Sequence, residues 1–261
     1  MTRLLSGVAL ALAVLAAILF LPPLGLRLLA CGVALVAARE YLRVLHHEGR
    51  RADPLPVLLL VALTCWWMAA AASADLLALL LVGLGWLAIE VVFRGLTVDR
   101  AAARFLAPWY IGMPLGMLAA VQATGGRPAT LLLIATVVVS DSAQYYSGRL
   151  FGRRPLAPTI SPKKTIEGAI GGAALATLFF TLVGPRVLPA ASIVSLAVVG
   201  LAIAALGICG DLFQSRLKRI AGVKDSAALI PGHGGLLDRI DALLFATPVF
   251  YLYMERFVVG R

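Results

Sequence analysis

Long apolar runs recur along the whole chain and constrain its fold more than any other feature. A helix needs about 20 apolar residues to cross roughly 30 Å of hydrocarbon. Nine charge-poor runs approach that length, at residues 4–21, 24–38, 55–74, 76–93, 105–121, 129–147, 166–184, 187–209 and 240–259. The chain is 61% hydrophobic and 14% charged, too little polar surface for a soluble globule. We predict an all-α, polytopic integral membrane protein with about nine transmembrane helices.

The spans are expected to form one continuous membrane domain. Residues 1–128 hold spans 1–5, and residues 129–261 hold spans 6–9 and most of the chemically interesting polar residues. Arg3 precedes the first run, and a second apolar run follows almost at once. We therefore expect the first run to be a retained signal-anchor helix, because a cleaved signal would precede a polar mature domain.

The positive residues predict the orientation of the chain. Lysine and arginine in short loops are retained on the cytoplasmic side of a membrane. If the N-terminus is cytoplasmic, eighteen of the 23 lysine and arginine residues fall on that side. The net charge of +10 is dispersed over these loops, so it does not indicate nucleic-acid binding.

A carboxylate interrupts the sixth run. At about 1.5 Å per residue, Asp141 would lie roughly 16 Å into this helix, where an unpaired carboxylate is costly. Tyr145 follows four residues later and shares its helix face. We interpret the two as the lining of a polar cavity open to the cytoplasm. The alternative is that Asp141 pairs with an interior cation such as Arg149.

A basic loop with several prolines follows, at residues 152–168. Ser161-Pro162 is typical of an N-cap followed by proline at the first helical position, which predicts a helix start there. Backbone N–H groups and lysines at a helix N-terminus favour phosphate binding. The loop is not a Walker loop, because the glycine required before the lysine is missing. The candidates for substrate binding in it are Ser161, Lys163, Lys164 and Thr165.

Residues 210–241 hold the highest density of charge in the chain. They contain four carboxylates, five cations and one histidine, and a Gly-His-Gly-Gly turn precedes Asp238. Asp241 follows three residues later, so both lie at the predicted start of the ninth span. A helix dipole stabilises carboxylates at its N-terminus, and hard oxygen ligands among cations suit Mg²⁺ bridging a polyphosphate. This segment predicts a phosphate-handling site.

Residues 137–245 resemble the phosphatidate cytidylyltransferases, also called CDP-diacylglycerol synthases. The segments at 141–145 and 161–168 are similar to elements of that family. Its signature is matched by Ser215, Lys218-Arg219, Lys224-Asp225, Pro231, His233-Gly234-Gly235, Asp238-Arg239 and Asp241.

The resemblance implies transfer of the cytidylyl group of CTP to phosphatidic acid, giving CDP-diacylglycerol and pyrophosphate. Both substrates are polyanions, so positive charge and a metal suit the reaction. The attacking phosphate oxygen is already ionised at neutral pH, so no strong general base is needed. The implied partners are CTP, phosphatidic acid and the lipid bilayer, with a homodimer left open. The implied location is the cell inner membrane, with the active site facing the cytoplasm.

The resemblance also implies roles for single residues. Mg²⁺ is the expected cofactor, with a second cation left open, and its first-choice ligands are Asp211 and Asp238, on the ends of consecutive helices. Asp241 and Asp225 are second choices. The other catalytic candidates are Lys218, Arg219, Lys224 and His233. The further substrate-binding candidates are Asp141, Tyr145, Ser215 and Arg239.

Two departures from the family pattern and two alternatives qualify this interpretation. Gln214 stands where many relatives carry glutamate, and Gln144 stands where a small apolar residue is usual. A nucleotidyl or phosphoryl transferase acting on an isoprenoid lipid phosphate would need similar spans. A cation-coupled transporter would need ionisable residues near the midplane of several spans, which only Asp141 and Glu90 approach.

Overall fold

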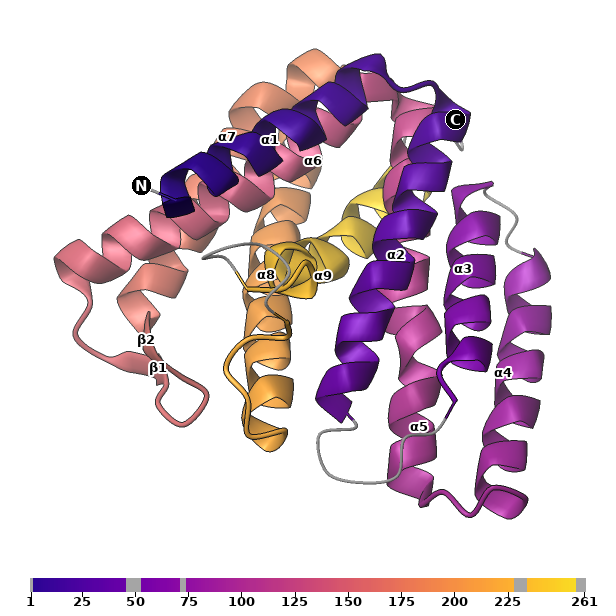
Figure 1. Cartoon of the computed structure of the whole chain (residues 1–261). Coiled ribbons are helices and arrows are strands. Elements are labelled where there is room, and N and C mark those ends of the chain that lie inside the picture. Colours follow the sequence, from indigo (N-terminus) through magenta and orange to yellow (C-terminus); the bar gives the residue numbers. More distant parts are fainter. Residues whose placement is uncertain (1, 46–52, 71–73, 228–233, 257–261) are drawn as a thin grey trace. The chain divides into compact units, whose positions relative to one another are not determined.

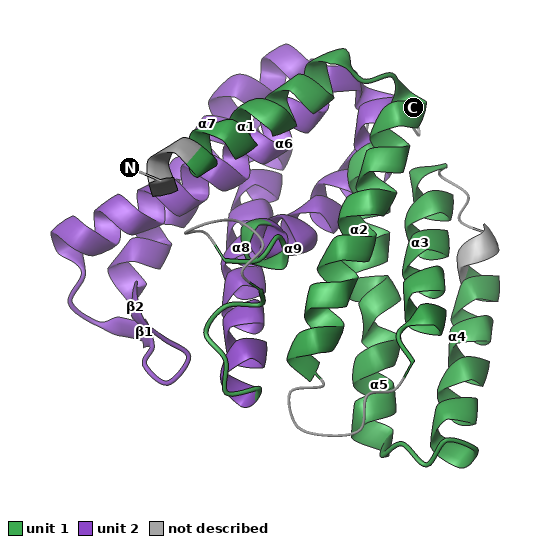
Figure 2. Ribbon diagram, viewed as in Figure 1, with its two compact units in different colours: residues 1–120, 221–239 green, residues 121–220, 240–261 purple. Residues whose placement is uncertain are grey.

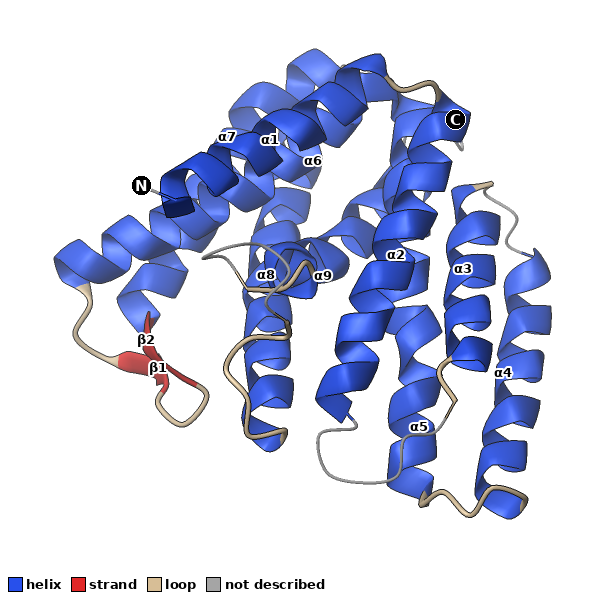
Figure 3. Ribbon diagram, in the orientation of Figure 1, coloured by secondary structure: helices blue, strands red, loops and turns tan. Residues whose placement is uncertain are grey.

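The computed structural model describes residues 2–45, 53–70, 74–227 and 234–256. These residues are predominantly helical, with one short hairpin as their only sheet (Figure 3). Figure 1 labels the helices α1 (Thr2–Phe20), α2 (Pro23–Leu45), α3 (Leu55–Ala69), α4 (Ala74–Val92), α5 (Val98–Ala107), α6 (Met113–Phe151), α7 (Ile166–Val187), α8 (Ile193–Ile220) and α9 (Leu237–Met254). A π-helical turn, η1 (Pro108–Gly112), joins α5 to α6. The strands are β1 (Pro155–Ala157) and β2 (Ser161–Thr165).

Several helices are long and apolar enough to cross a membrane, which confirms the prediction of a helical membrane protein. Within the described residues, three helical stretches are long and apolar enough, at Val98–Phe151, Ile166–Val187 and Ile193–Ile220. Shorter apolar helices cover Ser6–Phe20, Leu55–Ala69 and Leu77–Val92. The count of nine spans and the cytoplasmic N-terminus stay predictions.

The longest helical stretch contains the predicted boundary between spans 5 and 6. Gly126 has a φ of 71° and breaks the helical path inside α6, and Pro128 follows it. A positive φ is accessible to glycine because it has no Cβ. The two predicted spans are therefore separated by a backbone break without an intervening loop.

The chain forms two compact units, coloured separately in Figure 2. Unit 1 comprises Met1–Ala120 and Ala221–Arg239, and unit 2 comprises Val121–Ile220 and Ile240–Arg261. In this partition the segment Ala221–Arg239 is grouped with the N-terminal helices. The expected single continuous membrane domain stays a prediction.

Unit 1 is built around close contacts of α3 with α2, α4 and η1. A Cβ at Gly112 would lie 2.7 Å from the carbonyl oxygen of Val61, so this glycine lets η1 approach the α3 backbone. Glu90 and Arg104 are both buried in this unit and form an ion pair at 2.7 Å. The charges of these two buried residues are thus neutralised as a pair.

Unit 2 is centred on the packing of α7 against α8. Gly200 of α8 faces Phe180 of α7, and the Phe180 ring meets Phe250 of α9 edge to face, with centroids 5.7 Å apart. At the other end of α7, a Cβ on Gly168 would lie 2.8 Å from the Gln144 carbonyl of α6. Small residues therefore let α6 and α8 approach α7.

The basic loop is a hairpin, so the prediction of a helix start at Ser161-Pro162 is wrong. Both residues belong to β2, which pairs antiparallel with β1. A two-stranded sheet consists only of edge strands, where proline is tolerated. The N-cap of α7 is Thr165, whose hydroxyl oxygen accepts a hydrogen bond from the Gly168 amide at 3.1 Å.

The end of α8 also differs from the prediction. The eighth apolar run ends at residue 209, but the helix continues to Ile220. Charged and polar residues such as Asp211 and Lys218 reduce hydropathy without ending a helix. Asp211 therefore lies inside α8 and not at its end, whereas Asp238 lies in the first turn of α9, as predicted.

Candidate active site

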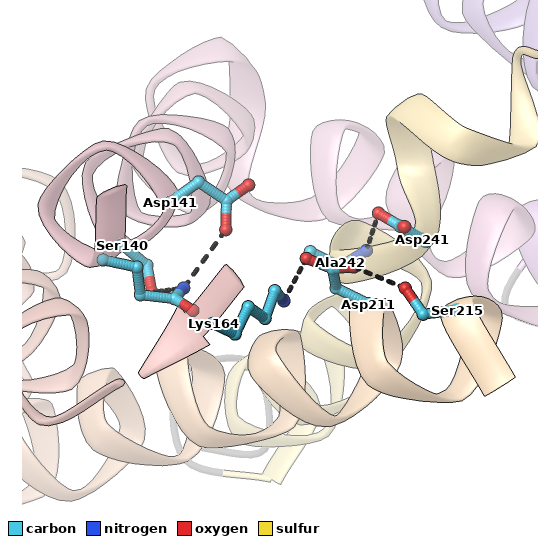
Figure 4. A network of polar contacts seen from close by, with 8 residues as sticks. Ser140, Asp141, Lys164, Asp211, Ser215, Asp241 and Ala242 are labelled. Carbon is cyan, nitrogen blue, oxygen red and sulfur yellow. Dashed lines mark hydrogen bonds and ion pairs between the residues drawn. The ribbon is translucent and has the colours of Figure 1, made fainter. Parts of the chain in front are cut away.

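Side chains from four elements of unit 2 meet in one polar cluster (Figure 4). Lys164 extends from β2 and forms an ion pair with the Oδ2 atom of Asp211 on α8. Ser215, one turn further along α8, donates a hydrogen bond to the Asp211 Oδ1 atom at 3.4 Å. Asp211 also interacts electrostatically with Asp141 of α6 and Asp241 of α9. The sequence separates these residues by up to 100 positions, and the fold gathers them.

A close approach of α8 to α9 brings the last two carboxylates together. A Cβ added to Gly210 would lie 2.5 Å from the carbonyl oxygen of Asp241 and 2.9 Å from the Phe245 ring. The glycine before Asp211 therefore lets the two helix backbones meet beside both carboxylates. The Asp241 Oδ1 atom accepts a hydrogen bond from the Ala242 amide at 2.8 Å, and Lys218 lies within electrostatic range.

Asp141 is oriented by its own helix. The Gln144 amide donates to the Asp141 Oδ1 atom and to Ser140 Oγ, both at 3.3 Å. Arg149 donates instead to the hydroxyl of Tyr145 at 3.3 Å. Lys164 of the hairpin lies within electrostatic range of Asp141, whose side chain is exposed, but the ion pair that this lysine forms is with Asp211.

The two adjacent lysines of β2 take different positions. Successive side chains of a strand point to opposite faces. Lys164 reaches the Asp211 carboxylate, whereas Lys163 is exposed. Arg219 is near the same hairpin, and its Nε atom donates to the Ile160 carbonyl at 3.4 Å. The hairpin is also fixed by Glu167, whose Oε2 atom accepts from the Arg153 amide at 3.0 Å.

The chemistry of this cluster suits a hard cation and phosphate. Three carboxylates provide oxygen ligands, and two lysines provide positive charge. Among the described residues, no three acidic, histidine or cysteine side chains converge tightly enough to enclose a metal by themselves. Mg²⁺ is commonly held by one or two carboxylates together with substrate phosphates and water. The donor set therefore fits Mg²⁺ that is completed by a phosphate substrate.

Asp238 belongs to a second network, inside unit 1. Its Oδ2 atom accepts hydrogen bonds from the Ser226 amide at 2.9 Å, the Ser226 hydroxyl at 3.0 Å and the Gly235 amide at 3.1 Å. Asp225 lies close to Gly234, which has a φ of 79°. The same Ser226 hydroxyl, which has one hydrogen to donate, also lies 2.9 Å from a carboxylate oxygen of Glu40, a buried residue of α2.

The remaining predicted residues fall into three groups. Lys224 and Arg239 are exposed in unit 1. Thr165 uses its hydroxyl as the α7 cap, and Ser161 lies in β2. Pro231 and His233 lie outside the described residues.

Sequence reasoning missed Glu40 and did not explain Gln144. Glu40 lies just beyond the second predicted apolar run, which ends at residue 38, but it is a buried residue of the helix α2. No local sequence signal marks it, because the backbone amides that it contacts lie almost 200 residues further along the chain. Gln144 had stood out only as a departure from the family pattern, and its contact with Asp141 follows from a three-residue spacing on a helix.

Comparison of the sequence with known proteins finds several bacterial relatives. Over 140 residues the chain is 48% identical to a phosphatidate cytidylyltransferase of Haemophilus influenzae, covering 49% of this chain and 46% of that protein. A phosphatidate cytidylyltransferase of Bacillus subtilis is 37% identical over 166 residues, 62% of this chain and 61% of the relative. The uncharacterized protein YnbB of Escherichia coli is 44% identical over 139 residues, 53% of this chain and 46% of YnbB.

These pairwise matches are partial, whereas the family match is not. The chain spans less than half the length of the Haemophilus and Escherichia relatives. The model of the cytidylyltransferase family matches residues 1–257, which is nearly the whole chain. The protein therefore belongs to the cytidylyltransferase family.

Proposed function

We propose that this protein transfers the cytidylyl group of CTP to phosphatidic acid, forming CDP-diacylglycerol and pyrophosphate. The observation that carries the proposal is the cluster of Asp141, Lys164, Asp211 and Asp241 in unit 2 of a cytidylyltransferase-family membrane protein. Two of the relatives described above are named for the same reaction. A cluster of hard oxygen ligands and lysines suits a reaction between two polyanions.

In the proposed reaction, a phosphate oxygen of phosphatidic acid attacks the α-phosphorus of CTP. The bond between that phosphorus and the oxygen leading to the β-phosphate breaks, and pyrophosphate leaves with the bonding electrons. Asp211 and Asp241, both in unit 2, are the proposed ligands of Mg²⁺. A ligand role for Asp238, the other first choice from the sequence, stays a prediction. When bound, Mg²⁺ would offset negative charge on the reacting phosphates.

The chain's own cations have separate proposed roles. Lys164 contacts Asp211 and would neutralise a phosphate oxygen of a substrate that binds beside this ion pair. Lys218 is the expected second phosphate contact, since it lies within electrostatic range of Asp241. Gln144 holds Asp141, so it would keep that carboxylate oriented as substrates bind. A second cation, a homodimer and contacts of the other candidate residues stay open.

The paired state of Glu90 argues against a cation-coupled transporter. A transport path requires ionisable groups that can exchange protons or ions. Glu90 is 1% exposed and forms ion pairs with Arg104 at 2.7 Å and Arg94 at 3.1 Å. Its charge is therefore neutralised within the fold.

The cellular placement is part of the proposal. CTP is a cytoplasmic nucleotide and phosphatidic acid is a bilayer lipid, so the reaction requires both phases. We infer an inner-membrane location with a cytoplasmic active site, supported by the excess of lysine and arginine in the loops predicted to face inward.

The direct test uses purified protein in detergent with CTP, phosphatidic acid and Mg²⁺. We expect pyrophosphate and CDP-diacylglycerol in equal amounts, loss of both with EDTA, and recovery with added Mg²⁺. A parallel reaction replaces phosphatidic acid with a polyprenyl phosphate of similar chain length. Product only from the polyprenyl acceptor would favour the isoprenoid alternative, and no product from either would overturn the proposal.

A further inference from the structure

Glu40 is a buried carboxylate far from the predicted catalytic segments in sequence. It lies in the last third of α2 and is 2% exposed, whereas Arg39 and Arg43 on either side are exposed. Removing a carboxylate from water is costly unless its oxygens are hydrogen-bonded. The contacts of Glu40 should therefore explain why the residue is there.

Both carboxylate oxygens of Glu40 accept hydrogen bonds from the start of α9. The Oε1 atom accepts from the Leu236 amide at 2.9 Å, and the Oε2 atom accepts from the Leu237 amide at 2.8 Å. The first amides of a helix have no partner inside the helix. A negative group at that end also interacts favourably with the helix dipole. Glu40 thus caps α9 from a helix almost 200 residues earlier.

The same carboxylate is linked to Asp238 through Ser226. The Ser226 hydroxyl lies 2.9 Å from Glu40 Oε2 and 3.0 Å from Asp238 Oδ2. The amides of Ser226 and Gly235 donate to that same Asp238 oxygen. All of these residues belong to unit 1.

Gly235 is needed for this arrangement. A Cβ at this position would overlap both the Ser226 hydroxyl and the Glu40 carboxylate. The absence of a side chain therefore lets the backbone at residue 235 lie directly against Glu40. This close approach gives the glycine in the sequence a physical reason beyond turn formation.

We propose that Glu40 is a positioning residue for cytidylyl transfer. It caps α9 and, through Ser226, fixes the carboxylate of Asp238 at the beginning of that helix. This inference rests on the proposed function, and it gives the N-terminal helices a part in the reaction. Glu40 touches neither substrate nor metal in this role, because its two oxygens are occupied by the segment that it holds.

The test replaces Glu40 by glutamine, which keeps the shape but turns one acceptor oxygen into an amide NH₂ group, a donor that faces a backbone N–H. Loss of a group that orients a metal ligand typically weakens metal affinity or activity by about 10- to 100-fold. We expect the Mg²⁺ concentration for half-maximal activity to rise within that range. Hydrogen exchange at the Gly235, Leu236 and Leu237 amides should accelerate. Glu40→Asp keeps both acceptors on a shorter stem and should recover part of the Mg²⁺ response.

Glu90→Gln is the matched control, since Glu90 is an equally buried glutamate of unit 1 that pairs with Arg104. We expect it to lower thermal stability without changing the Mg²⁺ response. Ser226→Ala is the second variant, because it removes one hydroxyl and leaves the Glu40 charge in place. It should shift the Mg²⁺ response in the same direction as Glu40→Gln even if the latter fails to fold.

The outcomes separate this inference from the proposed function. An unchanged Mg²⁺ response in both Glu40→Gln and Ser226→Ala would overturn the positioning role. Unchanged exchange at the Leu236 and Leu237 amides in Glu40→Gln would overturn the cap. If the wild-type protein forms no CDP-lipid, the proposed function fails, and with it the catalytic part of the inference. The exchange measurement would then still decide whether Glu40 holds α9.

Discussion

Asp211 and Asp241 are adjacent in the fold because Gly210 lets α8 meet α9. Each carboxylate lies within electrostatic range of the other and of a lysine, Lys164 for Asp211 and Lys218 for Asp241. This balance of charge keeps two acids close together in an apolar chain. It is also what a site for a cation and phosphate requires.

Neutralising either carboxylate should therefore stop turnover. We predict that Asp211→Asn and Asp241→Asn each lower kcat by about 100-fold or more, as expected when charge stabilisation of a transition state is lost. The measurement is CDP-lipid formation at saturating CTP and Mg²⁺. Asp99→Asn is the control, because Asp99 is exposed in the first turn of α5. Wild-type activity in either site variant would remove that residue from the metal site.

The two lysines of β2 offer a second comparison at the same scale. Lys164 contacts Asp211 and Lys163 is exposed, although both carry the same charge. A hydrogen bond to a charged group contributes about 1.5–3 kcal/mol, equivalent to roughly 10- to 150-fold. We predict a loss of kcat/KM for CTP in that range for Lys164→Met and a much smaller loss for Lys163→Met. Equal losses would indicate a general charge effect.

At the scale of elements, the hairpin and the start of α7 depend on two local contacts. Glu167 accepts hydrogen bonds from the amides of Arg153 and Arg154, and Thr165 caps the helix. The cap also faces Gly148 and Gly152 of the preceding segment. Lys164 immediately precedes the cap, so the same contacts determine where its ammonium group lies.

Removing the cap should destabilise this end of unit 2. Thr165→Val keeps the size and branching of the side chain but removes the acceptor, at a cost of about 1 kcal/mol. We expect a lower melting temperature in detergent for Thr165→Val and a near-wild-type value for Thr165→Ser. Equal melting temperatures for wild type and Thr165→Val would show that the cap contributes nothing.

At the scale of the whole molecule, the distribution of positive charge predicts which loops face the cytoplasm. Lys224 falls on the inner side and Arg127 on the outer side of the predicted topology. In a chain lacking Cys31, Cys65 and Cys209, a membrane-impermeant maleimide should label Arg127→Cys in intact cells. Lys224→Cys should react only after permeabilisation. The reverse pattern would invert the topology and remove the proposed access to cytoplasmic CTP.

The helical membrane class was predictable, because a helix that crosses a bilayer must be apolar along its length and therefore appears as an apolar run in the sequence. The helical break at Gly126 falls between the fifth and sixth predicted runs, and α9 begins at Leu237, close to the predicted start of the ninth run at residue 240. The end of α8 was not predicted, since hydropathy reports the environment of a helix and not its length. The cap of α7 was also misplaced, because Ser161 and Thr165 are both good capping residues and only the pairing of β1 with β2 distinguishes them.

The sequence by itself determined that this is a helical membrane protein with a charge-dense segment, because composition, spacing and charge are local properties. Only the tertiary structure decided which carboxylates share a cluster. It placed Asp141, Asp211 and Asp241 within electrostatic range in unit 2 and gave Asp238 its partners in unit 1. It also brought Glu40 into contact with the start of α9, nearly 200 residues later in the chain. Hydrogen bonds depend on distance in space, so the local sequence does not reveal them.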